Sequence, residues 1–341
     1  SVSYTEKGER NMRIFAIGFA AIALAVFGLT VLAERILIPI LQSKKAGQKI
    51  LEIGPRWHKS KEGTPTMGGL GFILPSLIVL TVFFLVQAAK GRASEYIPLS
   101  LTIGFAVMNG AIGFVDDYCK LIKKQNEGLT WKQKLLLQLV ASAAYVCVMA
   151  YTGNLDTAVR IPFTSIRLEL GYAAYPIAVL ILAGVVNGAN FTDGIDGLAS
   201  SVTFVIGGFF AVLAFYRFDL QLSVVSAVLL GSTLGFLVYN FHPARVFMGD
   251  TGSLFLGGLV IAGAFQTGDL GMGLLISGVF IIEMLSSLLQ RVYFKLTHGK
   301  RLFKMAPIHH HFEKCGWSEN KIVLIFSLVE LGFCLLAFAA M

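Results

Sequence analysis

The sequence predicts an all-α protein of the polytopic integral membrane class, with ten transmembrane helices. Three observations lead to this prediction. Of the 341 residues, 55% are hydrophobic and only 14% are charged, whereas a typical soluble domain has about 25% charged residues. The mean hydropathy of +0.73 exceeds what a soluble globule could cover with polar side chains. Apolar runs long enough to cross a bilayer, about 20 residues each, recur along the whole chain.

These apolar runs define the expected helices in order. The first is long enough to span and lacks a small-residue cleavage pattern, so we expect no cleaved signal peptide. The third and fifth are flanked by polar motifs that we place at the membrane surface, and the eighth is short and rich in glycine. The polar connections are short, so residues 1–341 are expected to form a single transmembrane domain. The ten helices are predicted at residues 13–40, 67–89, 97–115, 132–152, 173–189, 198–216, 222–240, 252–267, 271–293 and 321–340.

Lysine and arginine are spread unevenly over the connections, and this orients the helices. Clustered cations fall in one alternating set of connections, which comprises 41–66, 116–131, 190–197, 241–251 and 294–320. Because positively charged loops stay in the cytoplasm, we expect this set to be cytoplasmic and both termini to be extracytoplasmic. This bias toward cytoplasmic lysine and arginine accounts for the net charge of +8, which also fits attraction to acidic lipids or phosphorylated substrates. We therefore expect no nucleic acid partner. The four cysteines lack paired spacing, which predicts neither a disulfide framework nor a zinc site.

Adjacent carboxylates mark the end of the third expected helix. Asp116 and Asp117 repel each other there unless a cation compensates, and Lys120 lies one helical turn after Asp116, where the two can pair. A solvated acidic helix end would explain this motif alone. A further carboxylate, Asp250, stands in a turn of small residues that ends at Ser253.

Polar groups also interrupt the chain between the fifth and sixth helices. Asn190, Asp193 and Asp196 recur every three residues, so a helical turn would place them on one face. A helix cap needs only one such residue, which favours a ligand site over a simple cap. All of these carboxylates fall in the predicted cytoplasmic connections, so we expect the active site on the cytoplasmic face.

Cations and histidines accompany the carboxylates. Lys61 precedes a run of hydroxyl and glycine residues, and His309, His310 and His311 are consecutive in a basic connection. Three consecutive rings cannot easily face one ion, so hydrogen bonds to phosphate are a better explanation than zinc. Hard carboxylate oxygens suit Mg²⁺, and the chain has no phosphate-binding P-loop. The residues alone therefore indicate Mg²⁺-dependent phosphoryl transfer at the inner face of a membrane.

Five motifs resemble those of the phospho-N-acetylmuramoyl-pentapeptide transferases, within the polyprenyl-phosphate N-acetylhexosamine-1-phosphate transferase superfamily. The resemblance covers almost the whole chain. The paired aspartates and the motif at residues 190–198 are typical of the superfamily, and the motif at 307–313 is the more specific one. The five motifs are Thr64-Pro65-Thr66-Met67-Gly68-Gly69, Asp116-Asp117-Tyr118, Asn190-Phe191-Thr192-Asp193-Gly194-Ile195-Asp196-Gly197-Leu198, Phe247-Met248-Gly249-Asp250-Thr251-Gly252-Ser253 and Pro307-Ile308-His309-His310-His311-Phe312-Glu313.

The resemblance implies an activity in the bacterial cytoplasmic (inner) membrane. Phospho-MurNAc-pentapeptide would pass from UDP-MurNAc-pentapeptide to undecaprenyl phosphate, giving lipid I and UMP in the first membrane step of peptidoglycan synthesis. The implied cofactor is Mg²⁺, and the implied partners are these two substrates, the membrane lipid and a second copy in a homodimer. A sister transferase acting on GlcNAc-1-phosphate is the alternative within the superfamily.

The resemblance also implies roles for individual residues. Asp116, Asp117 and Asp250 would be catalytic, with Asp250 and Asp117 as metal ligands and Asp116 preparing or positioning the lipid phosphate. Phe247 would stack on uracil, because a nucleobase face needs an aromatic partner. The residues implied in substrate binding are Lys61, Thr66, Lys120, Lys132, Asn190, Asp193, Asp196, Asn240, Phe247, His309, His310 and His311.

Three mechanistic and functional alternatives remain at this level. The transfer can proceed by direct attack or through a covalent aspartyl intermediate, and direct attack is favoured because a phosphate monoester is already largely a dianion at neutral pH. An intramembrane aspartyl protease would need two embedded aspartates, whereas the acids here sit at the surface with lysine and histidine. An ion-coupled transporter would place its acids near the midplane rather than on one side.

Overall fold

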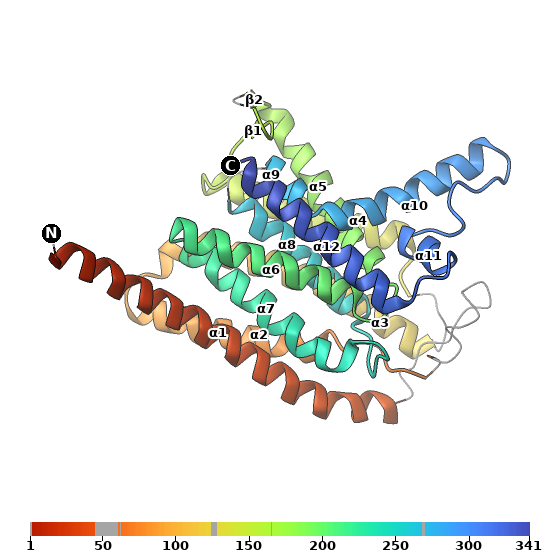
Figure 1. The fold of residues 1–341 in the computed structure, drawn as a ribbon, viewed down its shortest axis with the longest axis horizontal. Helices are drawn as coiled ribbons and strands as arrows, with labels where there is room; N and C mark the ends of the chain where they lie inside the picture. Colours follow the sequence, from red (N-terminus) through yellow and green to blue (C-terminus); the bar gives the residue numbers. More distant parts are fainter. Residues whose placement is uncertain (1, 45–60, 62, 124–127, 165, 268–269) are drawn as a thin grey trace.

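The computed structural model describes residues 2–44, 61, 63–123, 128–164, 166–267 and 270–341. Most of the basic connection 41–66 thus lies outside the described residues. The structure is a bundle of long helices (Figure 1). Its helices are α1 Val2–Ser43, α2 Leu70–Ala89, α3 Ile97–Lys123, α4 Trp131–Tyr151, α5 Ala174–Thr192, α6 Leu198–Arg217, α7 Leu220–Asn240, α8 Gly249–Phe265, α9 Leu270–Ile276, α10 Gly278–Leu296, α11 Ile308–Glu313 and α12 Glu319–Ala339.

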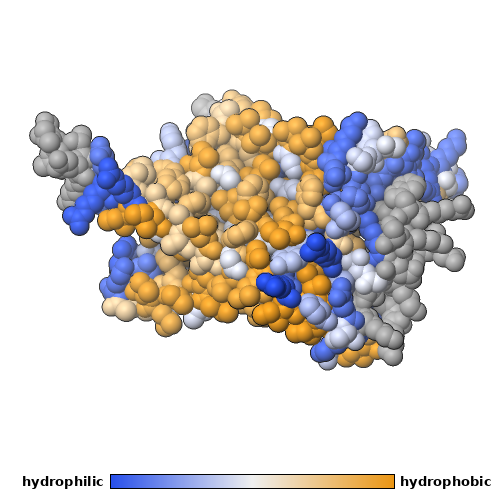
Figure 2. All heavy atoms as spheres, turned by 60° about the horizontal axis from the view of Figure 1, so that its bottom comes forward, coloured by the Kyte–Doolittle hydropathy of each residue, from blue (hydrophilic) through white to orange (hydrophobic). Residues whose placement is uncertain are grey.

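The surface confirms a polytopic membrane protein. Eight helical segments among the described residues are long and apolar enough to cross a membrane. Figure 2 shows a broad hydrophobic band over the middle of the molecule, with hydrophilic residues gathered at its two ends. Leucine and isoleucine side chains point outward along this band, where lipid rather than water would meet them. The expected ten spans and their orientation stay predictions.

The short helix α8 forms the centre of the bundle. Every residue from Thr251 to Phe265 is buried, because α3, α5 and α7 pack around this apolar, glycine-rich segment. Close approach to α3 depends on Gly113, where an added Cβ would lie 2.1 Å from the carbonyl oxygen of Asp250. This contact brings the end of α3 against the first turn of α8.

The expected ninth helix is broken in two. The helix stops at Ile276 and restarts at Gly278 as α10, which leans outward from the bundle in Figure 1. The buried carboxylate of Glu330 on α12 accepts a hydrogen bond from the backbone N–H of Val279 and so caps the start of α10. The apolar pattern runs through this break because both pieces are apolar, so periodicity alone does not reveal it.

Other segments also differ from the expected helices and loops, and α1 begins at Val2 rather than at residue 13. The connection 153–172 contains a two-stranded antiparallel hairpin of β1 Ala158–Arg160 and β2 Arg167–Glu169, so the chain is not purely α-helical. The third helix continues to Lys123, which places Asp116 and Asp117 inside it rather than at its end. The histidine run forms the short helix α11 instead of a loop.

Candidate active site

Three carboxylates meet where α3 lies against the start of α8. Asp116 and Asp117 come from α3 and Asp250 from the first turn of α8, and one oxygen of each lies within 4.8 Å of the others. Asp116 and Asp117 are buried, whereas Asp250 is partly exposed. Segments separated by more than 130 residues thus build one acidic centre.

Asp117 holds the first turn of α8 in place. One of its oxygens accepts hydrogen bonds from the Thr251 backbone N–H at 2.9 Å and the Thr251 hydroxyl at 2.7 Å. The other accepts from the Asp250 N–H at 3.3 Å. A carboxylate is favoured there because the first N–H groups of a helix lack partners within it and carry partial positive charge. Asp117 therefore fixes Asp250 through the backbone.

Two lysines compensate the negative charge of the acidic centre. The Lys120 ammonium lies 2.6 Å from Asp116 and 3.5 Å from Asp250, which confirms the expected pairing one turn along the helix. Lys134 on α4 lies 2.5 Å from Asp250. The expected phosphate ligand Lys132 is not brought into this centre, because its exposed ammonium lies over the Trp131 ring at 5.7 Å.

Asn190, Asp193 and Asp196 do not share one helical face, contrary to the expectation. Helix α5 ends at Thr192, so Asn190 alone lies on it, with Asp193 as its C-terminal cap. Asn190 donates hydrogen bonds to Asp250 and Ser253, both at 2.9 Å. Burial raises the pKa of Asp193 well above its usual value, and the neighbouring charges of Asp250 and Asp117 add to the shift.

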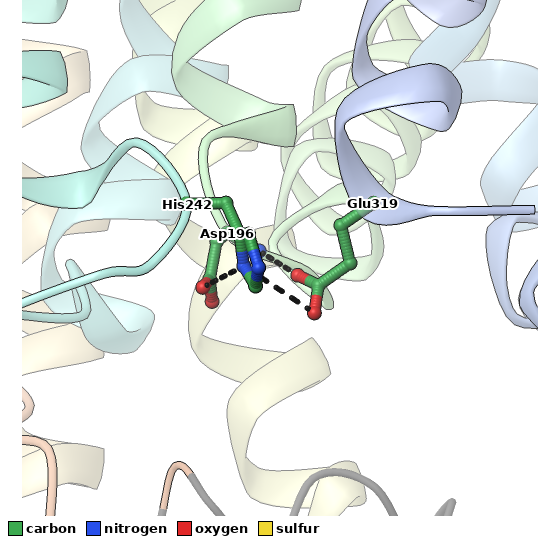
Figure 3. A group of neighbouring side chains, drawn as sticks. All are labelled: Asp196, His242 and Glu319. Carbon is green, nitrogen blue, oxygen red and sulfur yellow. Dashed lines mark hydrogen bonds and ion pairs between the residues drawn. The ribbon is translucent and has the colours of Figure 1, made fainter.

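Asp196 belongs to a second cluster, which Figure 3 shows with His242 and Glu319. His242 Nδ1 lies 2.8 Å from Asp196 and 3.7 Å from Glu319. The Lys61 ammonium bridges Asp196 at 2.7 Å and Glu319 at 2.6 Å. Burial alone would raise the pKa of Asp196, but hydrogen bonds from Lys61, the Ala244 N–H and His242 hold it below its ordinary value.

His242 and Glu319 were missed by sequence reasoning. Glu319 opens α12 directly after the capping Ser318, which makes it look like an ordinary acid in the first turn of a helix. His242 follows Asn240 in the connection after α7 and stands in no recognised motif. His242 and Glu319 are recognised as site residues only by their position beside Asp196, and no sequence pattern indicates that position.

Three further expected residues, Asn240, Thr66 and Phe247, make contacts with the loops around the two clusters. Asn240 is buried and joins two loops, since it accepts from the Gly197 N–H and donates to the Val246 carbonyl. Thr66 lies against Gly249, where an added Cβ would be 2.9 Å from the Thr66 hydroxyl. Phe247 is half-buried, and its backbone pairs with Pro65 and Gly68.

The three histidines point in different directions, as the sequence suggested. His309 is fully buried, with Nδ1 2.9 Å from Glu283 on α10. His310 Nδ1 contacts Glu313 in the same short helix. His311 Nδ1 accepts a hydrogen bond from the Lys304 backbone N–H. The His309 ring reaches the loop carrying Asp193, because it rests against Gly194.

The acidic centre has the donor set that a hard divalent cation requires. Asp116, Asp117 and Asp250 present oxygens within 4.8 Å of one another, and carboxylate oxygen is the ligand type that Mg²⁺ prefers. Asp250 is the most accessible of the three, and its first turn of helix is already held by Asp117. The residues present therefore fit a magnesium ion.

Comparison with known proteins gives the family. Residues 98–267 match the model of glycosyl transferase family 4. The chain is 44% identical to the phospho-N-acetylmuramoyl-pentapeptide-transferase of Halalkalibacterium halodurans, over 91% of this chain and 94% of the relative. The chain belongs to the phospho-N-acetylmuramoyl-pentapeptide transferases. Two other relatives carry the same name. The one from Bacillus subtilis is 44% identical over 88% of this chain and 90% of its own length, and the one from Clostridium perfringens is 45% identical over 90% of this chain and 91% of its own length.

Membership of this transferase family connects the site to the fold. The segment that matches the glycosyl transferase model, 98–267, contains Asp116, Asp117, Asn190, Asp193 and Asp250. The histidine helix α11 and Glu319 lie beyond it, in the part covered by the full-length relatives. The acidic centre thus lies within the segment that matches the glycosyl transferase model, and α11 lies outside that segment.

Proposed function

We propose that this chain transfers phospho-MurNAc-pentapeptide from UDP-MurNAc-pentapeptide to undecaprenyl phosphate, giving lipid I and UMP. The convergence of Asp116, Asp117 and Asp250 with two lysines at one end of a membrane-spanning bundle carries the proposal. The shared name of its relatives supplies the substrates. The protein would act as a single domain of residues 1–341 in the bacterial cytoplasmic membrane, with the site facing the cytoplasm.

The residues divide the work between the two clusters. Asp250 and Asp117 would hold Mg²⁺, which supplies charge neutralisation at the diphosphate when bound. Lys120 and Lys134 add positive charge where the phosphates of both substrates must meet. Asn190, Asp193, Asp196, Asn240 and Phe247 would hold the nucleotide and sugar.

Asp116 is proposed to position the lipid phosphate. An oxygen of that phosphate forms the new bond to the β-phosphorus, and the bond from this phosphorus to the bridging oxygen breaks, so that UMP leaves. The attacking phosphate is largely a dianion at neutral pH, and little proton removal is needed. Placement in line with the leaving group is therefore the main requirement. Exchange of labelled UMP into the UDP-sugar without lipid phosphate would instead indicate a covalent intermediate.

The experiment measures UMP release by the purified protein in detergent with both substrates, in Mg²⁺ and in EDTA. We expect release only with Mg²⁺, and a loss of about a hundredfold or more in Asp250→Asn and Asp116→Asn. Asp156→Asn is the matched control, since Asp156 pairs with Arg167 beside the hairpin, away from the acidic centre. Full activity in both site variants would refute the assignment, and preference for UDP-GlcNAc would indicate the sister activity.

A further inference from the structure

A buried glutamate and a buried histidine form a pair beside the loop between α5 and α6. Glu283 on α10 and His309 on α11 are both 0% exposed, and Glu283 Oε2 lies 2.9 Å from His309 Nδ1. The short helix is docked on α10 by a second contact, in which the Ile308 N–H donates to the Ser286 hydroxyl at 3.0 Å. The histidine ring is therefore fixed from the α10 side.

The opposite edge of the ring faces the loop between α5 and α6. A Cβ added at Gly194 would lie 2.2 Å from His309 Nε2 and 2.6 Å from its Cε1, so this edge of the ring touches the glycine next to Asp193. Nε2 has no hydrogen-bond partner in the described part of the chain. A buried polar nitrogen without a partner is unfavourable, which indicates that a ligand completes the site.

We propose that Glu283 is the positioning residue that makes His309 a hydrogen-bond donor to the substrate diphosphate. The proposal rests on the function proposed above. It adds a residue from α10, outside all five motifs, to the machinery of the transfer. Glu283 acts only through the histidine and does not itself touch the substrate.

The chemistry follows from the two ring nitrogens. A carboxylate at Nδ1 must accept the proton there, which sets the orientation of the ring and leaves Nε2 toward Gly194. A phosphate oxygen is an acceptor, so Nε2 can bind it only when it also carries a proton. The negative charge of Glu283 would compensate the second ring proton that a bond from Nε2 to phosphate requires. Glu283 Oε1 has no hydrogen-bond partner among the described residues, so His309 is the group that balances it.

The kinetic test uses Glu283→Gln, His309→Asn and the double variant. We expect Glu283→Gln to lower kcat about ten- to hundredfold, the usual range for a partner that orients a histidine, with an unchanged KM for undecaprenyl phosphate. The double variant should be no slower than His309→Asn alone. Independent, multiplicative losses in the double variant, or an unaffected kcat in Glu283→Gln, would overturn the proposal.

Two further variants separate positioning from folding. Glu330→Gln changes another buried glutamate that contacts α10, and it should retain activity because an amide oxygen still accepts the Val279 N–H. Gly194→Ala displaces the His309 ring without touching Glu283 and should reproduce the kinetic loss. Retained activity in Gly194→Ala would contradict the proposed contact even if Glu283→Gln failed to fold.

A spectroscopic measurement tests the ring without turnover. In protein labelled with ¹⁵N-histidine, the His309 signals, assigned by their loss in His309→Asn, should show both nitrogens protonated in the wild type. In Glu283→Gln they should show a neutral ring. Unchanged signals would refute the role of Glu283. Because this measurement needs no substrate, its outcome is independent of whether the proposed transfer activity is observed.

Discussion

Lys134 and Lys132 lie two positions apart on the first turns of α4 but meet different surroundings. Lys134 pairs with Asp250 at 2.5 Å, whereas Lys132 is exposed beside Trp131. We predict that Lys134→Ala lowers the rate of UMP release about tenfold or more, because the carboxylate loses its nearest cation among the described residues. Lys132→Ala serves as the matched control, with a change below about twofold. A larger loss in Lys132→Ala would restore the role expected from the sequence.

The folded protein disfavours the charged form of the Asp193 side chain. Because burial and the nearby carboxylates raise its pKa, folding favours the protonated form of Asp193. The contribution of Asp193 to the free energy of unfolding is fully favourable below its pKa in the unfolded chain, near pH 4. That contribution is lost as the pH rises toward the pKa of Asp193 in the folded protein, because Asp193 releases its proton first in the unfolded chain. Asp193→Asn, which is always neutral, should therefore stabilise the substrate-free protein at neutral and alkaline pH.

The thermal unfolding midpoint, measured in EDTA from pH 4 to pH 8, tests this sign. The Asn variant should melt above the wild type at pH 8, by on the order of 2 °C for each kcal/mol of relieved repulsion. The difference should shrink toward pH 4, while the same variant loses transfer activity. A difference that stays constant with pH would show that the substitution acts through packing instead.

At the scale of single elements, the contact between α3 and α8 decides whether the acidic centre forms. Gly113→Ala would place a Cβ 2.1 Å from the Asp250 carbonyl oxygen, so the helices must separate. We predict a lower unfolding midpoint and a loss of transfer activity of about tenfold or more, since overpacking costs about 1–3 kcal/mol. Both are measured on the purified protein in detergent.

Gly104→Ala is the control in the same helix. Nothing lies within 4 Å of a Cβ added at Gly104, which is exposed on the outer side of α3. Alanine is also a better helix former than glycine, so stability should be unchanged or slightly higher. Equal damage from both substitutions would mean that α3 tolerates no alanine at all, and would remove the support for a specific contact with α8.

For the whole molecule, the predicted orientation can be tested by labelling. We expect the hairpin to be extracytoplasmic and the connection between α11 and α12 to be cytoplasmic. Two single-cysteine variants report on this: one carries Thr164→Cys in the hairpin, and the other keeps only the native, exposed Cys315. A membrane-impermeant maleimide should label Thr164→Cys in intact cells and Cys315 only after permeabilisation. The reverse pattern would invert the orientation and move the site to the outer face.

Both ends of the described chain lie on the same side of the bundle. Arg160 of the hairpin and Arg217 at the end of α6 both contact Met341, and Phe15 of α1 packs edge-on against Phe215 of α6. Figure 1 shows both termini away from the connection between α10 and α11. This arrangement agrees with the expected common location of the termini, whichever face of the membrane it occupies.

Much of the fold could be read from local patterns, and the exceptions have physical causes. Apolar runs locate most helices to within a few residues, because a membrane span needs its length in consecutive residues. The break at Ser277 was missed because its stabilising partner, Glu330, comes more than fifty residues later. The extension of α3 to Lys123 was missed because polar residues lowered the apolar signal while the helix continued into the acidic centre.

The sequence alone determined the membrane class, the family and the carboxylates of the centre, because these depend on composition and on short contiguous motifs. The tertiary structure decided which polar groups meet: Lys134 instead of Lys132 at Asp250, His242 and Glu319 at Asp196, and Glu283 at His309. The physical reason is that ion pairs and hydrogen bonds act over a few ångströms in space, whereas their partners lie tens to hundreds of residues apart along the chain.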